Sequence, residues 1–137
     1  MTGNTGGNDL VAIVNQLKPG INGEAYGSFD ASTATDTVVM PLIMDRNSGY
    51  FTGFNVQNVG GSSTTVTCSY TGSTHTDVAT IAPGEAMNAL QLNALADGYV
   101  GSGTCVASGG GSIIGVVNEL GPSGTADQLL VYEGINN

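Results

Sequence analysis

Few side chains in this sequence belong to the types that perform chemistry, and those few are widely spaced. The 137 residues include two cysteines, Cys68 and Cys105, and a single histidine, His75. Zinc sites combine such residues in closely spaced pairs such as Cys-x₂-Cys, and no such pair is present here. The sequence therefore predicts no metal site built on cysteine and histidine.

The two cysteines are instead candidates for a disulfide. Cys68 lies in the alternating segment 64–70, and Cys105 lies in the segment 98–107. If these segments are neighbouring strands, a bond between them is worth about 3–4 kcal/mol in the chain-entropy description, and it fits an oxidising compartment. The alternative is a pair of buried free thiols that behave as small hydrophobic groups. We expect the disulfide.

The remaining polar residues do not form a recognisable catalytic set. His75 lies in a turn just before Asp77, where a solvated histidine is expected, and no serine stands in a G-x-S-x-G elbow. The acidic segments 30–36 and 45–48 offer oxygen atoms but do not follow the order of an EF-hand calcium loop. We therefore predict a protein that is not an enzyme and holds no cofactor or metal ion.

Composition limits the partners of the chain. Eleven acidic residues face only Lys18 and Arg46, so the net charge is −9. This balance excludes the positive surface that nucleic acids require. No apolar run approaches the roughly 18 residues of a transmembrane helix, and the start of the sequence shows no signal peptide. If the protein is exported, we expect this sequence to be a mature segment.

Apolar residues repeat with a period of two along most of the chain, which indicates β-strands. Gly-, Ser- and Pro-rich turns separate them, and one domain is expected at this length. Such a pattern favours an antiparallel β-sandwich over a barrel. One segment, 86–96, has apolar residues at helical spacing and is interpreted either as a helix or as an irregular crossover. The expected strands are 51–59, 64–70, 76–81, 98–107, 112–120 and 128–133.

Residues 10–30 match residues 113–133 at a constant offset of 103. Val14, Asn15 and Leu17 recur identically in the second copy, and a Pro- and Gly-containing loop follows in both. A repeat of two strands and a loop indicates an internal duplication. We therefore divide the chain into an N-terminal extension, residues 1–30, which resembles the C-terminal hairpin, and a sandwich domain, residues 31–137.

The N-terminal extension admits three interpretations. It is exchanged between identical subunits, it packs on its own domain in a piece of a tandem array, or it is one of two related hairpins in a pseudo-symmetric sandwich. For strand exchange, the expected interface residues are Val11, Ile13, Val14 and Leu17, which repeat the apolar pattern of segment 114–120. A spare strand of this kind adds to a neighbour through main-chain hydrogen bonds, and a head-to-tail contact propagates into a fibre unless it closes into a ring.

Three segments resemble a known family. The strand 53–60 ends in Asn-Val-Gly, segment 64–67 reads Thr-Thr-Val-Thr, and segment 81–85 contains Ala-Pro-Gly. This order resembles the immunoglobulin-like, cell-adhesion-related modules of bacterial and archaeal surface proteins. The resemblance covers residues 51–85 and implies an immunoglobulin-like antiparallel β-sandwich, here with an additional N-terminal strand or hairpin, on the cell surface. It implies no catalytic residues.

Together these observations predict a non-catalytic structural subunit of an extracellular filament or surface assembly, which polymerises with copies of itself. The alternative is a carbohydrate- or protein-binding adhesin module. Carbohydrate sites use exposed aromatic rings, and because the chain has no Trp, the candidates are Tyr26, Tyr50 and Tyr99.

Overall fold

The computed structural model describes residues 13–18, 22–122 and 129–137, and these residues form antiparallel β-sheets with two short 3₁₀ turns. The strands and turns are β1 (Ile13–Lys18), β2 (Asn22–Gly27), η1 (Ala31–Thr33), β3 (Thr37–Asp45), β4 (Phe51–Asn58), β5 (Thr64–Tyr70), β6 (Thr76–Ile81), β7 (Ala86–Gln91), β8 (Tyr99–Ala107), η2 (Ser108–Gly110), β9 (Ile113–Leu120), β10 (Leu129–Glu133) and β11 (Ile135–Asn136).

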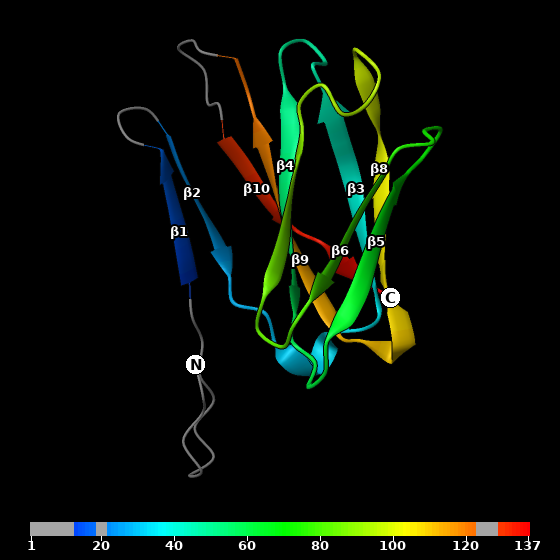
Figure 1. The fold of residues 1–137 in the computed structure, drawn as a ribbon. Helices are drawn as coiled ribbons and strands as arrows, with labels where there is room; N and C mark the ends of the chain where they lie inside the picture. Colours follow the sequence, from blue (N-terminus) through cyan, green and yellow to red (C-terminus); the bar gives the residue numbers. More distant parts are fainter. Residues whose placement is uncertain (1–12, 19–21, 123–128) are drawn as a thin grey trace.

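Two sheets enclose one core, as predicted for a β-sandwich (Figure 1). Sheet I has the order β10-β9-β4-β7, and sheet II has the order β11-β3-β8-β5-β6. Alternate residues of each strand point inward, so the period of two in the sequence becomes the core face of each sheet. The most deeply buried apolar side chains come from both sheets: Phe54, Val56, Ile113 and Val117 from sheet I, and Val38, Met40, Ile43 and Val66 from sheet II.

The order of the strands agrees with an immunoglobulin domain at its centre and differs at its ends. The pairs β4–β7 and β5–β8 correspond to the central B–E and C–F pairs of that fold. However, β3, which stands in the place of strand A, pairs with β8, whereas strand A of an immunoglobulin domain pairs with strand B. Similarly, β9 stands in the place of strand G but pairs with β4, whereas strand G pairs with strand F. The sandwich is confirmed, and its immunoglobulin-like character stays a prediction.

Strand β3 has no counterpart among the strands expected from the sequence. Its residues 38–44 are apolar on both faces and so do not alternate in hydrophobicity, and in addition the register against β8 shifts between Met40 and Ile43. Residues 41 and 42 are both exposed there, so the buried positions change from even to odd numbers. Pro41 lies at this bulge, where its missing N–H removes no ladder hydrogen bond.

Segment 86–96 is not a helix. Residues 86–91 form β7, an edge strand paired with β4, and residues 92–98 form a loop. Met87 and Gln91 point into the sandwich, while Leu90 is exposed. The helical spacing of the apolar residues was misleading because pairing with β4 overrides a weak local preference.

Asn58 forms side-chain hydrogen bonds to nearby backbone groups, and Gly84 adopts a positive φ in the turn after Ile81; both are typical of these residue types. The buried Asn58 side chain donates to the carbonyls of Ser62 (2.8 Å) and Ile81 (3.1 Å) and accepts from the Gly60 N–H (2.9 Å). Gly84 has φ +80°, which suits the third position of a type II turn, and the Glu85 N–H donates to the Ala82 carbonyl. Asn58 thus joins sheet I to the end of β6 in sheet II.

Candidate functional site

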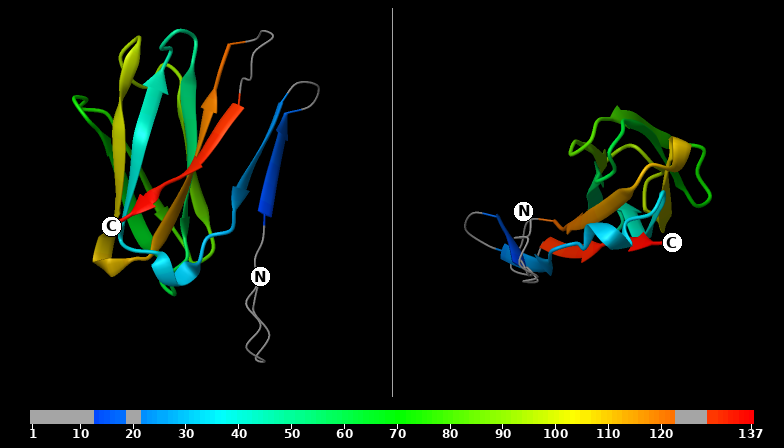
Figure 2. Two further views of the ribbon diagram at one scale, coloured as in Figure 1. Left: turned by 180° about the vertical axis from the view of Figure 1, so that it is seen from behind. Right: turned by 90° about the horizontal axis from the view of Figure 1, so that it is seen from below.

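The N-terminal hairpin stands beside the sandwich and belongs to neither of its sheets. Strands β1 and β2 pair only with each other among the described residues, from Ile13 opposite Gly27 to Lys18 opposite Asn22. Figure 1 shows the hairpin next to β10, and Figure 2 shows the same separation from behind and from below. An isolated two-stranded hairpin is marginally stable in water, so this element depends on the surfaces that cover it.

The structure places two of the four predicted interface residues, Ile13 and Val14, on opposite faces of β1. Val14 lines a groove between the hairpin and sheet I, whereas Ile13 is 71% exposed. Successive residues of a strand point to opposite sides, so Ile13 faces away from that groove. The backbone of Leu17 belongs to β1, but its side chain lies outside the described residues, and so does Val11.

The groove measures about 570 Å³ and lies over the outer face of sheet I. From the hairpin side it is lined by Val14, Tyr26 and Phe29, and the rings of the last two lie 6.4 Å apart. From the sheet side Ala86, Ile114 and Val116 contribute apolar surface, and Asn55 and Gln57 contribute amides. None of the described residues that line it carries a charge. Such a lining suits an apolar chain segment or an uncharged ligand.

The two related segments of the sequence form hairpins with different registers. The offset of 103 places Val14 on Val117 and Phe29 on Tyr132. Val117 pairs with Tyr132, whereas Val14 pairs with Tyr26 rather than with Phe29, three residues away. A shift by an odd number of residues exchanges the two faces of a strand. The two similar segments therefore both form a β-hairpin, but equivalent residues have different partners on the opposite strand.

The predicted disulfide is present. Cys68 of β5 lies directly opposite Cys105 of β8, both are fully buried, and their sulfur atoms are bonded. Because both strands belong to sheet II, the bond joins neighbouring strands and does not link the two sheets. It fixes the register of β5 against β8 at the centre of the core.

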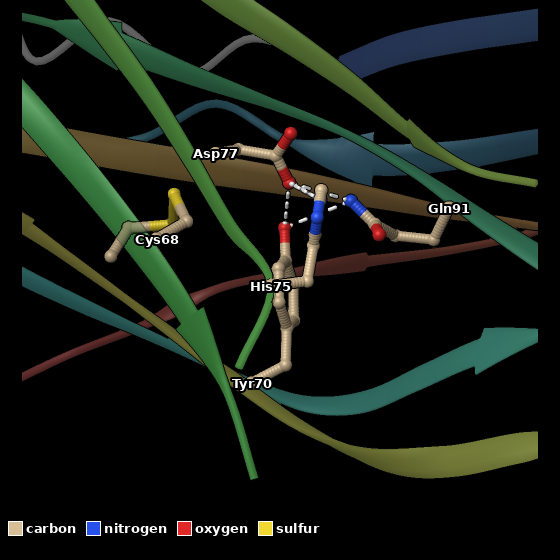
Figure 3. Close-up of a disulfide and its surroundings, with 6 residues drawn as sticks. Cys68, Tyr70, His75, Asp77 and Gln91 are labelled. Atoms are coloured by element: carbon tan, nitrogen blue, oxygen red, sulfur yellow. Dashed lines mark hydrogen bonds and ion pairs between the residues drawn. A yellow bond between two sulfur atoms is a disulfide. The ribbon is translucent and has the colours of Figure 1, made fainter. Parts of the chain in front are cut away.

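His75 belongs to a polar cluster that joins the two sheets (Figure 3). The Tyr70 hydroxyl donates to Asp77, and the Gln91 amide donates to Tyr70 (2.8 Å) and to Asp77 (2.9 Å). His75 stacks on Tyr70 with ring centroids 5.8 Å apart, and its Nε2 lies 3.4 Å from Asp77 Oδ2. Its side chain is 34% exposed and its Nε2 atom is buried, so the histidine is only partly solvated, in contrast to the expected fully solvated side chain. Sequence reasoning missed the cluster because its members lie on three different strands.

The electrostatics of this cluster keep Tyr70 protonated. Burial raises the pKa of the Tyr70 hydroxyl well above its ordinary value, and the hydrogen bond to Asp77 and its negative charge raise it further. Tyr70 is therefore a hydrogen-bond donor and not a nucleophile or a base. Because Tyr70 and Asp77 belong to sheet II and Gln91 to sheet I, the cluster ties the edge strands β6 and β7 together.

A second polar group crosses the sandwich near the β3 bulge. Glu119 is 1% exposed and accepts from Thr52 Oγ1 at 2.9 Å, while Thr52 accepts from the Met44 N–H at 2.7 Å. Tyr132 of β10 donates to the Leu42 carbonyl and accepts from its N–H. Burial raises the pKa of Glu119 to about 7, although the hydrogen bond from Thr52 opposes this shift.

The carboxylates weighed as calcium ligands already have protein donors. The buried Asp45 accepts from Arg46 Nε (2.7 Å), the Asn93 N–H (3.1 Å) and the Leu95 N–H (2.8 Å). Asp30 accepts from the Ser32 N–H at 2.8 Å. Within the described ranges, no group of three or more histidine, cysteine, aspartate or glutamate side chains is placed to hold a metal ion.

Of the tyrosines weighed as sugar platforms, only Tyr26 lines the groove. Tyr99 donates to the Thr71 carbonyl at 2.8 Å on the opposite side of the molecule in sheet II, and Tyr50 is half-buried beside the β3–β4 turn.

Comparison with known proteins gives no relative: no protein-family model, curated protein or solved structure matches the chain. In the part of the chain that the structure describes, no helix has the length and apolar character needed to cross a membrane.

Proposed function

We propose that this protein is a non-catalytic structural subunit of an extracellular filament or surface assembly, in which the N-terminal hairpin joins one copy to the next. The observation that carries this proposal is the hairpin itself. Among the described residues no strand pairing joins it to either sheet, and it presents Ile13 at 71% exposure. An exposed apolar strand with an unpaired edge is a template for another chain.

Other features support the same function. The disulfide is compatible with an oxidising, extracellular compartment. The sequence resemblance to immunoglobulin-like surface modules points to the same location. The polar clusters of Tyr70 and Glu119 are engaged in holding the two sheets together. Because these hydrogen bonds hold the two sheets together, the sandwich suits a mechanical role. A contact between the hairpin of one copy and a different surface of the next copy is head-to-tail, and such a contact extends into a fibre.

Removal of residues 1–23 tests this proposal. The truncated protein should stay monomeric in sedimentation-velocity experiments, while the full chain assembles and shows fibres or rings in negative-stain images. A peptide of residues 10–23 should bind the truncated protein. Ile13→Asp in the full chain should also prevent assembly, because it would bury an unpaired carboxylate at the contact. A full chain that is monomeric at high concentration contradicts the proposal.

An adhesin module is the second candidate, and the position of Tyr26 and Phe29 beside the groove favours it specifically. Aromatic rings next to amide side chains suit an uncharged sugar. A monomeric full chain that shows glycan-dependent NMR shifts at groove residues would support this function in place of assembly.

A further inference from the structure

The groove over sheet I has the character of a site for an uncharged, apolar segment of chain. Its volume of about 570 Å³ is in the range of well-formed binding sites. Eleven acidic residues are distributed along this chain, and none of those that the structure describes lines the groove. Two copies with a net charge of −9 repel each other, so their contact is most favourable where neither contributes a charge.

The sequence that leads into β1 and the first residues of β1 have the complementary character. Residues 10–14 read Leu-Val-Ala-Ile-Val, five uncharged apolar residues in succession, and the structure describes the chain from Ile13 onward. Ile13 is the most exposed of the large hydrophobic side chains in the described ranges. It points away from the groove of its own molecule, because its neighbour Val14 lines that groove. The apolar surface of Ile13 is thus available to another molecule.

We propose that this groove is the acceptor for the start of β1 from a second copy of the chain, with the second copy's Ile13 seated against Ala86 and Ile114. The inference rests on the proposed function, for which it identifies the receiving surface. Donor and acceptor are different surfaces of each copy, so the contact is heterologous and continues from one copy to the next.

A matched pair of substitutions on β7 tests the acceptor. Ala86 lines the groove, whereas Asn88 lies two residues along the same strand, on the same exposed face, and does not line it. Ala86→Glu should weaken assembly by about tenfold or more, because the new charge would be buried at the contact. Asn88→Glu adds the same charge and should change assembly by less than about twofold. Equal effects of the two substitutions would overturn the assigned acceptor surface.

Cysteine trapping tests which molecule fills the groove. The described chain has no free cysteine, so an added thiol reacts only with another added thiol. A mixture of Ile13→Cys and Ala86→Cys proteins should form a covalent dimer on mild oxidation, and a mixture of Ile13→Cys with Val78→Cys should not. Val78 is an exposed residue of β6 in the other sheet. A third protein carries both Ile13→Cys and Ala86→Cys. If its added cysteines form a bond only within one molecule, and the mixture of single variants forms no dimer, the proposal is overturned.

These outcomes separate this inference from the proposed function. If Ile13→Asp prevents assembly while Ala86→Glu does not, the hairpin joins the copies but the groove is not its acceptor. If the full chain does not assemble at all, the proposed function fails first.

Discussion

Glu119 is a carboxyl group inside the sandwich, and its hydrogen-bond partner in the described part of the chain is a neutral hydroxyl. Thr52 is its hydrogen-bond donor, and the side chain is 1% exposed. Burial raises its pKa to about 7, so the folded protein holds this proton more tightly than the unfolded chain does. Its contribution to stability is therefore complete below about pH 4.5 and is lost as the pH rises through 7.

Glu119→Gln keeps the size of the side chain and removes this titration. The substituted protein should gain stability relative to the natural protein as the pH rises from 5 to 8, by on the order of 1–3 kcal/mol at pH 8. Urea unfolding at a series of pH values measures the difference. The exposed acid Glu133, changed to Gln, is the control and should leave the pH dependence unaltered. A constant difference across this range would show that Glu119 does not titrate there.

The bond between Cys68 and Cys105 closes a loop with a sequence separation of 37. Replacement of both cysteines by Ala should lower the free energy of unfolding by about 3–4 kcal/mol and leave the fold intact, since the bond lies between strands that are already paired. Thiol titration of the denatured, unreduced protein should detect no free sulfhydryl. Detection of two would show that the natural protein does not form the bond.

At the scale of elements, one carboxylate holds the loop that joins β7 to β8. Asp45, at the end of β3, accepts from the backbone N–H groups of Asn93 and Leu95 and from Arg46. Arg46 also donates to the Leu95 carbonyl at 3.2 Å. Burial raises the pKa of Asp45, but the hydrogen bonds from Arg46, Leu95 and Asn93 outweigh it and leave the pKa below its ordinary value. The ionised form is therefore the one that supports this loop.

Asp45→Asn should lower the free energy of unfolding by about 1–3 kcal/mol at pH 7, because charged hydrogen bonds to a buried group are lost. The stabilisation by Asp45 is present above its unfolded pKa near 3.8 and disappears as the pH falls through the lower folded value. Hydrogen exchange at the Asn93 and Leu95 amides should become faster in the variant at neutral pH. Unchanged exchange rates would mean that the loop is held by other contacts.

Side chains of the other sheet hydrogen-bond the backbone groups of β3 at its bulge. Where the ladder to β8 shifts, the Leu42 N–H and carbonyl bond to the Tyr132 hydroxyl, and the Met44 N–H bonds to Thr52. Both side chains come from sheet I, so an irregularity in one sheet is satisfied by the other. Buried backbone groups require such partners, and here they also fix how the two sheets stack.

At the scale of the whole molecule, charge opposes the assembly that the hairpin promotes. Each copy carries −9, and the described positive side chain Arg46 is already paired with Asp45 and lies 3.5 Å from Asp97. Salt screens repulsion between copies but leaves burial of apolar surface intact. Assembly should therefore strengthen as NaCl rises from about 20 mM to about 500 mM, as followed by sedimentation velocity. Assembly that dissolves with added salt would indicate ionic contacts between copies instead.

Much of this protein follows from its sequence alone. The period of two and the Gly-rich turns predicted a β-sandwich and the positions of most strands, because one face of each strand must be buried whatever its partner is. The two cysteines, each in a separate alternating segment, were sufficient to predict their bond. The turn at Gly84 and the hydrogen bond from the Gly60 N–H to Asn58 suit their residue types, since both depend on local backbone geometry, whereas the bond from Asn58 to the Ile81 carbonyl depends on the fold.

Only the tertiary structure decided the rest, because those features depend on contacts between residues far apart in the chain. Strand β3 does not alternate in hydrophobicity, so only its pairing with β8 revealed it, and pairing with β4 made a strand of a segment with helical spacing. The packing of the N-terminal hairpin beside sheet I decided that Val14 faces the groove and Ile13 faces outward. The environments of Tyr70 and Glu119 likewise arise from strands that meet only in the folded molecule, where burial raises the pKa of both side chains.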